Sequence, residues 1–375
     1  MIRAHREIGT SIEAVCLDDP RQEFLRDFEC PVHALNQSLL GRYAFSPRLW
    51  RWLNANVGRF DGVVMNGIWT FPGVALYLAA RRAKKPYGVF VHGALDPWFN
   101  RRYPLKRIKK MLYWPVEHAV LRRARAVFFT TKTERDLAKT SFRPSRWNSV
   151  VVPYGIMPPR ESRGLAEAQI EEFYGKLPAL RGRRFLLFLA RIHKKKGCDL
   201  LLKAFAQLGD AARDVDLVIA GPDQTGMQAS LERLAKQLGI AGRVHWPGLI
   251  GGDVKWGALR ACEALALPSH QENLGISIVE ALAVGRPVLI SKQVNIWQEV
   301  EGDGAGLADN DTLEGVTRLL RRWFSLLPAE RDAIVNRARP CFAARFSMRE
   351  AALAINRVFG LAKAEVADGE PVGRQ

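Results

Sequence analysis

The sequence predicts an α/β protein in which parallel sheets carry helices on both faces. Short runs rich in β-branched and aromatic residues alternate with longer helical patterns along the whole chain, an order typical of βαβ units. The chain has 375 residues, which is long enough for two domains that each bury a core of their own. Residues 153–184 contain four prolines and separate two sets of strand candidates. We therefore expect two α/β domains joined by a linker.

Each strand candidate is a short apolar run bounded by turn-forming residues. In the first half the candidates are Ile12–Leu17, Val32–Leu35, Gly62–Asn66, Tyr87–His92, Ala126–Thr130 and Ser149–Val152. In the second half they are Phe185–Ala190, Asp216–Ala220, Arg243–Trp246, Ala264–Leu267 and Pro287–Ser291.

The composition is that of a globular protein. Hydrophobic residues make up 48% of the chain and charged residues 25%. The apolar runs are far shorter than the roughly 18 to 20 residues that span a bilayer, and the opening residues MIRAHREIGTS hold no apolar segment of a signal peptide. Five scattered cysteines without metal-ligand spacing indicate reduced thiols and a cytoplasmic location.

The net charge of +18 is concentrated in the first half of the chain. Residues 1–180 carry 29 Lys and Arg against 16 Asp and Glu, whereas residues 181–375 carry 27 against 22. Such a charge is compatible with plain solubility, with binding to nucleic acid, or with adhesion to an anionic membrane surface.

The segment from Ser269 to Ile290, SHQENLGISIVEALAVGRPVLI, holds the strongest functional signal. Asn273-Leu274-Gly275 predicts a turn, and Ile276 to Val284 predicts a helix. A helix that begins after a glycine turn offers unpaired N–H groups and a positive dipole end, which suit a diphosphate. Glu272 precedes the helix, where a carboxylate can accept hydrogen bonds from sugar hydroxyls, and Glu280 lies about two turns inside, within reach of a ribose. The pattern outlines a nucleotide-sugar site.

This element of Glu, seven residues and Glu resembles the signature of the retaining glycosyltransferases of family 4. The segment LARIHKKKG, residues 189–197, is similar to that family's Arg/Lys phosphate clamp, and the resemblance includes Val91-His92-Gly93, Gly221-Pro222 and Pro247-Gly248. The family implies the GT-B fold, in which two doubly wound Rossmann-like domains face each other across a cleft.

The resemblance also divides the chain into parts. These are an acceptor-side domain (1–155), a linker with a short helix (156–182), a nucleotide-sugar-binding domain (183–342), a helix returning to the first domain (343–365) and a polar tail (366–375).

The beginning of the chain departs from the family, which opens with a strand and a glycine-rich loop. Here Arg3–Gly9 resembles the tail of the first helix, followed at once by the strand Ile12–Leu17. The first strand and its loop are therefore expected to be missing. We hypothesise a start codon placed too late, which an in-frame upstream extension of strand and Gly-Gly type would support.

The resemblance implies roles for individual residues of the donor site. Arg191 and Lys196 would stabilise the diphosphate leaving group as its bond to the sugar breaks. Glu272 with Asn273, Leu274 and Gly275 would bind the sugar and phosphate, and Glu280 the ribose. The alternatives are a solvated basic turn for the two cations and a helix-surface carboxylate for Glu280. Further donor contacts would come from Gly221, Pro222, Pro247 and Gly248.

On the opposite domain, His92 and Gly93 would face the donor sugar, although a lone His at a strand end can also be a core residue. Asp96 caps the following helix or contacts substrate. No obvious carboxylate pair for double displacement is apparent, so the family implies same-face attack, with the leaving phosphate helping to deprotonate the acceptor. No metal or other cofactor is expected, because the cationic clamp takes the place of Mg²⁺.

The basic segment Pro104 to Arg125 places Leu105, Ile108, Leu112 and Val116 at helical spacing. An amphipathic helix packed on the core is one interpretation. The other is an interfacial surface for an anionic membrane. Its cations would be Lys106, Arg107, Lys109 and Lys110.

The first functional hypothesis is a retaining hexosyltransferase that uses a UDP- or GDP-sugar and a lipid-linked saccharide acceptor in cell-surface polysaccharide assembly. Such a protein would be cytoplasmic or peripheral on the inner face of the membrane. The alternatives are a basic nucleic-acid-binding protein, which no zinc spacing or RNA-recognition motif supports, and a GT-B sugar-nucleotide epimerase. We therefore expect no nucleic acid as partner.

Overall fold

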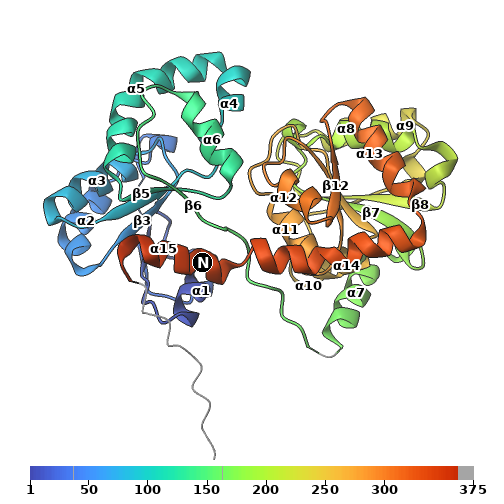
Figure 1. The fold of residues 1–375 in the computed structure, drawn as a ribbon, viewed down its shortest axis with the longest axis horizontal. Coiled ribbons are helices and arrows are strands. Elements are labelled where there is room, and N and C mark those ends of the chain that lie inside the picture. The colour runs from blue at the N-terminus through green and yellow to red at the C-terminus, as the bar shows by residue number, and fades with distance from the viewer. Residues whose placement is uncertain (37, 163, 362–375) are drawn as a thin grey trace, which may run out of the picture.

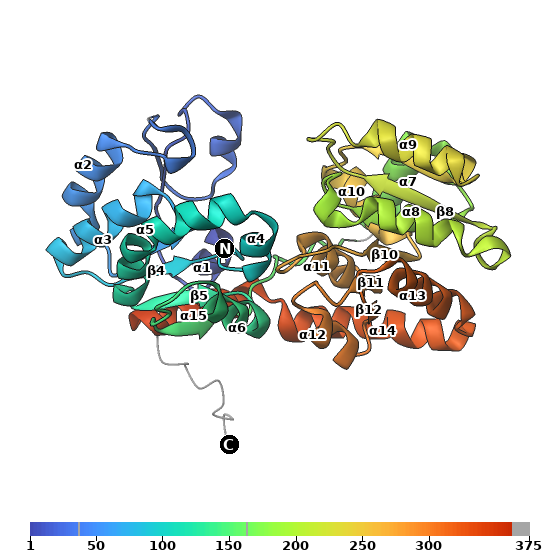
Figure 2. The same cartoon turned by 90° about the horizontal axis from the view of Figure 1, so that it is seen from above.

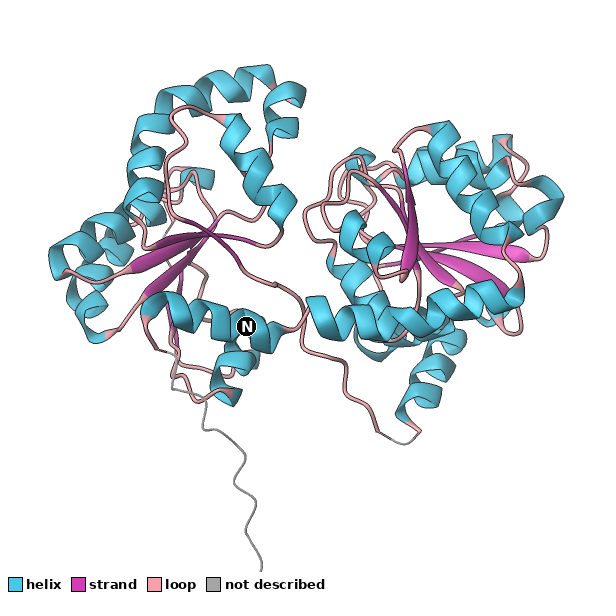
Figure 3. Ribbon diagram, in the orientation of Figure 1, coloured by secondary structure: helices cyan, strands magenta, loops and turns pink. Residues whose placement is uncertain are grey.

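The computed structural model describes residues 1–361 other than 37 and 163. It confirms the predicted fold class, since two α/β domains with parallel sheets lie next to each other (Figure 1). Helices flank the sheets in both domains (Figure 3). All the strand candidates form strands, with ends that shift by one or two residues. The expected polar tail lies outside the described residues.

The second domain is built on one six-stranded parallel sheet in the order β12-β11-β10-β7-β8-β9. Its central strands are buried, apart from Arg184 at the start of β7, because helices cover both faces, as their continuous apolar sequences require. The strands are β7 (Arg184–Leu189), β8 (Val215–Ala220), β9 (Val244–Gly248), β10 (Ala264–Leu267), β11 (Val288–Ser291) and β12 (Gly306–Asp309). The helices are α8 (Cys198–Ala206), α9 (Gln228–Gln237), α10 (Gly252–Ala261), α11 (Ile276–Ala283), α12 (Trp297–Gly302), α13 (Leu313–Ser325) and α14 (Pro328–Arg345).

Two elements of this domain differ from the sequence prediction. Strand β12 was not predicted, because its four residues Gly-Leu-Ala-Asp carry no β-branched side chain and no alternation. Helix α7 (Leu165–Lys176), expected within the linker, packs on α10 so closely that a Cβ atom on Gly257 would lie 1.9 Å from the Gln169 carbonyl oxygen. The helix therefore belongs to the body of the second domain.

The first domain contains two separate parallel sheets. Strands β3 (Val63–Asn66), β4 (Tyr87–Phe90), β5 (Ala126–Phe129) and β6 (Ser149–Val151) pair in that order, while β1 (Ala14–Cys16) pairs only with β2 (Val32–Ala34). The helices are α1 (Ile2–Glu7), α2 (Pro47–Asn56), α3 (Phe71–Ala83), α4 (Pro97–Arg102), α5 (Pro104–Arg123) and α6 (Lys132–Ser141). The upstream strand expected from the sequence stays a prediction.

The chain crosses between the domains twice, and the two crossings lie side by side. After α14 the chain enters α15 (Met348–Phe359), which buries Met348, Ala351 and Ile355 against the first domain (Figure 1). Ile156 and Ser347 form an isolated parallel bridge between the crossings. A Cβ atom on Gly155 would lie 1.7 Å from the Phe346 carbonyl oxygen, so only glycine permits this approach.

Seen from above, the side of the first domain that carries α4 and α6 faces the side of the second that carries α11 and α12 (Figure 2). This arrangement places the loops at the carboxyl ends of the strands of both sheets toward one interface, where ligands of open α/β sheets bind.

Candidate active site

Three loops meet at the carboxyl ends of β7, β8 and β9. The Gly221 amide donates to the Gly248 carbonyl oxygen at 2.8 Å, and the Ile192 amide donates to the Pro222 carbonyl oxygen at 3.0 Å. Gly221 has φ +152°, and a Cβ atom there would lie 1.9 Å from the Ala190 carbonyl oxygen. The glycine is therefore required for the loops to approach. The structure thus brings together Gly221, Pro222, Pro247 and Gly248, the residues that the sequence assigned to the donor.

Lys196 and Glu272 form an ion pair at the centre of this edge. Lys196 ends the short 3₁₀ helix Lys194–Lys196 after β7, and its side chain is 12% exposed while that of Glu272 is 15% exposed. Arg191 lies nearby on the surface, where its guanidinium donates to Gln224 Oε1 at 3.1 Å. The predicted cations and the predicted carboxylate therefore share one site, in which Lys196 is already paired.

The turn before α11 is held rigidly by its neighbour in the fold. The Glu272 amide donates to the Gln293 carbonyl oxygen and the Asn295 amide donates to the Glu272 carbonyl oxygen, each at 3.0 Å. Gly275 adopts φ +72° and caps α11, whose first amides are left without partners inside the helix. A fixed turn, a cation and a helix start are features that suit a diphosphate. Leu274 is buried and supports the turn from below.

Glu280 has a protein partner that sequence reasoning missed. Its Oε1 atom accepts a hydrogen bond from Lys255 Nζ at 2.6 Å, and both side chains are mostly buried. Lys255 lies on α10, and its ammonium is 4.5 Å from the centre of the Trp256 ring. A buried carboxylate needs hydrogen-bond partners, and the structure supplies one in Lys255. The ribose contact stays a prediction.

On the facing domain, His92 and Gly93 follow β4 in left-handed backbone conformations, with φ of +46° and +74°. His92 Nε2 lies 2.9 Å from Asn66 Oδ1. Since that oxygen only accepts, Nε2 carries the proton and Nδ1 is left as an acceptor. His92 is exposed at the surface, but partial desolvation of its ring, opposed by the charge of Glu134, lowers its pKa. His92 is therefore neutral at pH 7.

A buried carboxylate holds the loop after β4. Glu134, 3% exposed, accepts hydrogen bonds from the Gly93 amide at 2.5 Å, from the Thr130 amide at 2.7 Å and from Thr130 Oγ1 at 2.9 Å. Thr131 Oγ1 accepts from the Glu134 amide at 2.9 Å and caps α6. The sequence carried a signal for this arrangement, because Thr131-Lys-Thr-Glu134 has the spacing of a capping box.

Side chains of the two domains touch at the same place. Asn273 Nδ2 donates to Thr130 Oγ1 at 3.0 Å, and Gln271 Nε2 donates to Asp96 Oδ2 at 2.8 Å. A Cβ atom on Gly93 would lie 3.4 Å from Asn273 Cβ. Asp96 Oδ1 also accepts from the Trp98 amide at 2.8 Å, so this residue both caps α4 and reaches the opposite domain. Residues predicted on the two sides of the cleft are therefore in contact.

The basic loop after β7 creates a positive field in the site. Burial first, and then the charge of Arg191 and its Lys neighbours, lowers the pKa of His193. Burial also lowers the pKa of Lys195, whose ammonium lies 5.1 Å from the Phe99 ring of the other domain. An anion bound beside them would raise both pKa values, because a nearby negative charge favours the protonated forms. Within residues 1–361, apart from 37 and 163, no cluster of His, Cys, Asp and Glu could hold a metal ion.

The basic segment of the first domain forms α5, and its apolar stripe faces outward. Leu105 is 82% exposed, Ile108 58% and Leu112 80%, while Trp114 and Leu121 on the opposite side are buried. Of the two interpretations of this segment, the one in which the stripe packs on the core is therefore wrong. Lys110 packs 4.7 Å from the Trp69 ring, away from the stripe. Lys106, Arg107 and Lys109 remain exposed beside it.

Comparison with known proteins places this geometry in a family. Residues 169–339 match the model of the "Glycosyl transferases group 1", and residues 1–155 match that of the "Glycosyl transferase 4-like domain". The chain belongs to the group 1 glycosyltransferases. This membership confirms the resemblance on which the site residues were assigned.

Among the relatives of this glycosyltransferase chain is a 2-deoxystreptamine glucosyltransferase of Streptomyces kanamyceticus, 31% identical over 56% of this chain and 54% of the relative. The D-inositol 3-phosphate glycosyltransferase of Actinosynnema mirum is 34% identical over 41% of the chain and 38% of the relative. The chain thus spans about half or less of these relatives.

Solved structures share the whole fold. Anabaena HepE in complex with UDP and glucose superposes with a TM-score of 0.73 and 18% identity over 96% of this chain and 94% of that one. WaaG, a glycosyltransferase involved in lipopolysaccharide biosynthesis, gives a TM-score of 0.66 and 18% identity over 94% and 100%. The GT-B architecture of the chain is thereby confirmed.

Proposed function

We propose that the protein is a retaining glycosyltransferase that moves a hexose from a nucleoside-diphosphate sugar to a lipid-linked saccharide in cell-surface polysaccharide assembly. The observation that carries this proposal is the ion pair of Lys196 and Glu272 at the start of α11. The pair brings a cation and a carboxylate next to the first amides of α11, and this combination supports binding of a diphosphate and its sugar.

The paired state suggests what the donor does on binding. The diphosphate offers Lys196 a stronger partner than the Glu272 carboxylate, because it carries more charge and more acceptor oxygens. Glu272 is then released to accept hydrogen bonds from the sugar hydroxyls. Arg191, whose present partner is a neutral amide, joins Lys196 on the phosphate oxygens.

The chemistry follows from this placement. The bond between the anomeric carbon and the diphosphate oxygen breaks, and the acceptor oxygen bonds to the same face of that carbon. The proton of the acceptor hydroxyl passes to an oxygen of the departing diphosphate. Lys196, Arg191 and the amides of α11 stabilise the negative charge that grows on the leaving group. We propose that these groups act without a metal ion.

The nature of the donor is supported by structural neighbours. HepE has been solved with UDP, with UDP and glucose, and with UDP-glucose. A UDP-hexose is therefore the first donor to test here, with a GDP-hexose as the alternative.

A panel of UDP- and GDP-hexoses tests the proposal. We expect one donor to be hydrolysed slowly alone and consumed faster with membrane extracts as a source of acceptor. Lys196→Met, Arg191→Ala and Glu272→Ala should each abolish most of this activity. Lys194→Met is the matched control, because Lys194 is an exposed neighbour in the same basic run. Activity that survives both Arg191→Ala and Glu272→Ala would overturn the assignment.

The outward stripe of α5 supports the lipid-linked acceptor. A helix that presents Leu105, Ile108 and Leu112 to solvent beside Arg107 and Lys109 has the composition of an interfacial helix. Its apolar side chains would enter the acyl boundary while the cations meet anionic headgroups. Among the described residues, no helix has the length and apolar character to span a bilayer. We propose that α5 docks the protein on an anionic membrane surface.

Co-sedimentation with vesicles tests this docking. We expect binding to vesicles with about one third phosphatidylglycerol and little binding to pure phosphatidylcholine, since each cation contributes about 1 kcal/mol near such a surface. Leu112→Ser should weaken binding, whereas Leu327→Ser should not. Leu327 is a matched control because it is 66% exposed on the second domain. Equal binding by both variants contradicts the proposal.

A further inference from the structure

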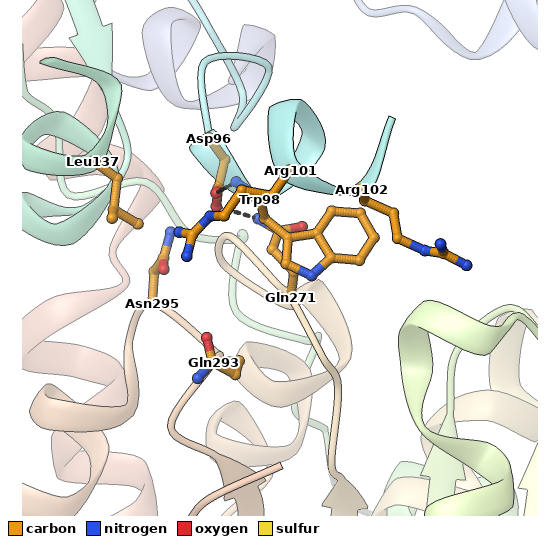
Figure 4. A pocket seen from close by; sticks show the side chains of 8 residues that line it. All are labelled: Asp96, Trp98, Arg101, Arg102, Leu137, Gln271, Gln293 and Asn295. Carbon is orange, nitrogen blue, oxygen red and sulfur yellow. Dashed lines mark hydrogen bonds between the residues drawn. The ribbon is translucent and has the colours of Figure 1, made fainter. Parts of the chain in front are cut away.

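A pocket of about 340 Å³ lies between the domains beside the donor turn (Figure 4). Its first wall comes from the segment Asp96–Arg102, which includes α4, and its second from the loops that contain Gln271 and Asn295. In Figure 4 the Trp98 indole lies between the two walls, and Arg101 extends across the pocket toward Asn295. The pocket thus needs both domains to exist.

Gln271 lines the second wall of the pocket and carries a buried hydrogen-bond acceptor without a partner. Gln271 is 4% exposed, and its Nε2 atom donates to Asp96 Oδ2 at 2.8 Å, which fixes the amide. Its Oε1 atom is buried and has no hydrogen-bond partner within the described part of the chain. A buried carbonyl oxygen without a hydrogen-bond partner destabilises the structure, and a ligand hydroxyl that donates to it would remove this cost. The amide is therefore placed to bind a hydroxyl group.

The opposite wall presents cations without counter-charges. Arg101 and Arg102 are both exposed, and neither forms an ion pair with any residue that the structure describes. The single carboxylate that lines the pocket, Asp96, already accepts from the Trp98 amide and from Gln271. The two residues are neighbours on α4, and their guanidinium groups extend to opposite sides of the Trp98 indole (Figure 4). Each group presents a planar set of donors that matches the oxygens of a phosphate.

The position of the pocket relates it to the reaction. Gln271 directly precedes Glu272, and Asn295 Nδ2 donates to Asn273 Oδ1 at 3.1 Å, so the pocket adjoins the sugar end of the donor site. On its other side, α4 leads through Tyr103 into α5, where the exposed stripe begins at Leu105. The order along this face is the donor turn, the pocket, Arg101 with Arg102, and then the apolar stripe of α5.

We propose that this pocket is the acceptor subsite and that it binds a saccharide esterified to phosphate or diphosphate. The sugar lies against the Trp98 ring with a hydroxyl on Gln271, and the phosphoryl oxygens bind Arg101 and Arg102. This inference rests on the proposed function and adds the chemical class of the acceptor. A free sugar phosphate and a lipid-linked sugar diphosphate share the recognised group.

Calorimetry with a filled donor site tests the inference. The donor identified by the transfer assay is supplied as its 2-deoxy-2-fluoro analogue, and glucose 1-phosphate, N-acetylglucosamine 1-phosphate and the two free sugars are titrated. We expect a phosphorylated sugar to bind at least about tenfold more tightly than its free form, because charge-assisted hydrogen bonds are lost with the phosphate. The variant R101Q/R102Q should remove this preference and leave donor affinity unchanged.

The matched control is R122Q/R123Q, which removes an equally exposed tandem pair at the far end of α5 and should keep the preference. Farnesyl-diphosphate-linked N-acetylglucosamine distinguishes the two sources. Binding of this probe alone, lost in R101Q/R102Q, assigns the pocket to a lipid-linked acceptor, whereas binding of the free sugar phosphates assigns it to those.

Equal affinity for phosphorylated and free sugars, or a preference that persists in R101Q/R102Q, overturns the inference while the proposed function stands. Absence of any donor binding or turnover rejects the proposed function and this inference with it.

Discussion

The two domains arrange their charged groups in opposite ways. At the edge of the second domain, Glu272 and Glu280 are each paired with a lysine, and both pairs are mostly buried. The first domain instead leaves exposed cations beside apolar side chains, namely Arg101, Arg102, Lys106, Arg107 and Lys109. A small charged ligand needs a pre-built site, while an acceptor at a membrane needs an open surface. The contrast therefore separates donor recognition from acceptor recognition, and it can be tested domain by domain.

The largest effect is expected from removing a paired charge of the donor site. Lys196→Met should lower kcat by about 10²–10³, because one stabilising group for the leaving phosphate is lost. Steady-state transfer with the identified donor measures the loss. A drop of less than about threefold would show that the pair is structural. Lys194→Met should stay near the activity of the unmodified protein.

The next effect concerns pH and has opposite signs in the two domains. Burial raises the pKa of Glu117 in the first domain to about 7, from an ordinary value of 4.5. The folded domain then holds a proton that the unfolded chain releases. The contribution of this proton to the free energy of unfolding is fully present below pH 4.5. It falls by roughly 3 kcal/mol as pH rises through 7. Urea unfolding at pH 5 and pH 8 should show this fall, and Glu117→Gln should remove it.

In the second domain, Asp216 gives the reverse dependence. Its burial opposes ionisation, but hydrogen bonds from Arg183 and His245 outweigh that effect and lower its pKa. The stability that these bonds provide is present above the unfolded pKa and is lost as pH falls through the folded one. The free energy of unfolding of Asp216→Asn should therefore lack this decrease at acid pH, which urea unfolding measures. If Glu117 and Asp216 changed stability in the same direction with pH, this difference between the domains would be contradicted.

A smaller effect is expected from the carboxylate that holds the loop after β4. Glu134→Gln puts an amide where three donors converge and should cost about 2 kcal/mol of unfolding free energy. Hydrogen exchange at the Gly93 amide should speed up together with global unfolding. Asp136→Asn, two residues away and 59% exposed, should change stability by less than about 0.5 kcal/mol.

The smallest effect should come from the second pair of the donor site. Lys255→Met leaves Glu280 without its partner, and we expect the KM for the donor to rise about tenfold at nearly constant kcat. Such a result would mean that the pair positions Glu280 for the nucleotide. Lys236→Met, an exposed lysine on α9, is the control, and an equal KM in both variants would contradict the role.

The sequence was a good guide where function depends on a local pattern. Glu272, the glycine turn and the following helix lie within one short segment, so their spacing alone determines their relation in space. The buried strands were found for the same reason, because continuous apolar runs identify them. Strand β12 was missed because its sequence is too short and too poor in β-branched residues to carry that signal.

Other features depend on contacts that no spacing reveals. Lys255 reaches Glu280 only because α10 and α11 are neighbours in the fold. Gln271 and Asp96 are 175 residues apart and meet across the domain interface. The α5 stripe illustrates a different limit, since helical periodicity is the same whether the apolar face points inward or outward. Its direction was set by Trp114 and Leu121 on the opposite side of the helix.

The doubled crossing between the domains has a consequence for motion. Ile156 is bridged to Ser347, and Gly155 lies against Phe346. The two connections are therefore expected to act as one hinge between the domains. We expect them to permit one swing that brings the two halves together and to resist sliding and twisting. Each swing would then return Arg101 to the same place over the donor turn.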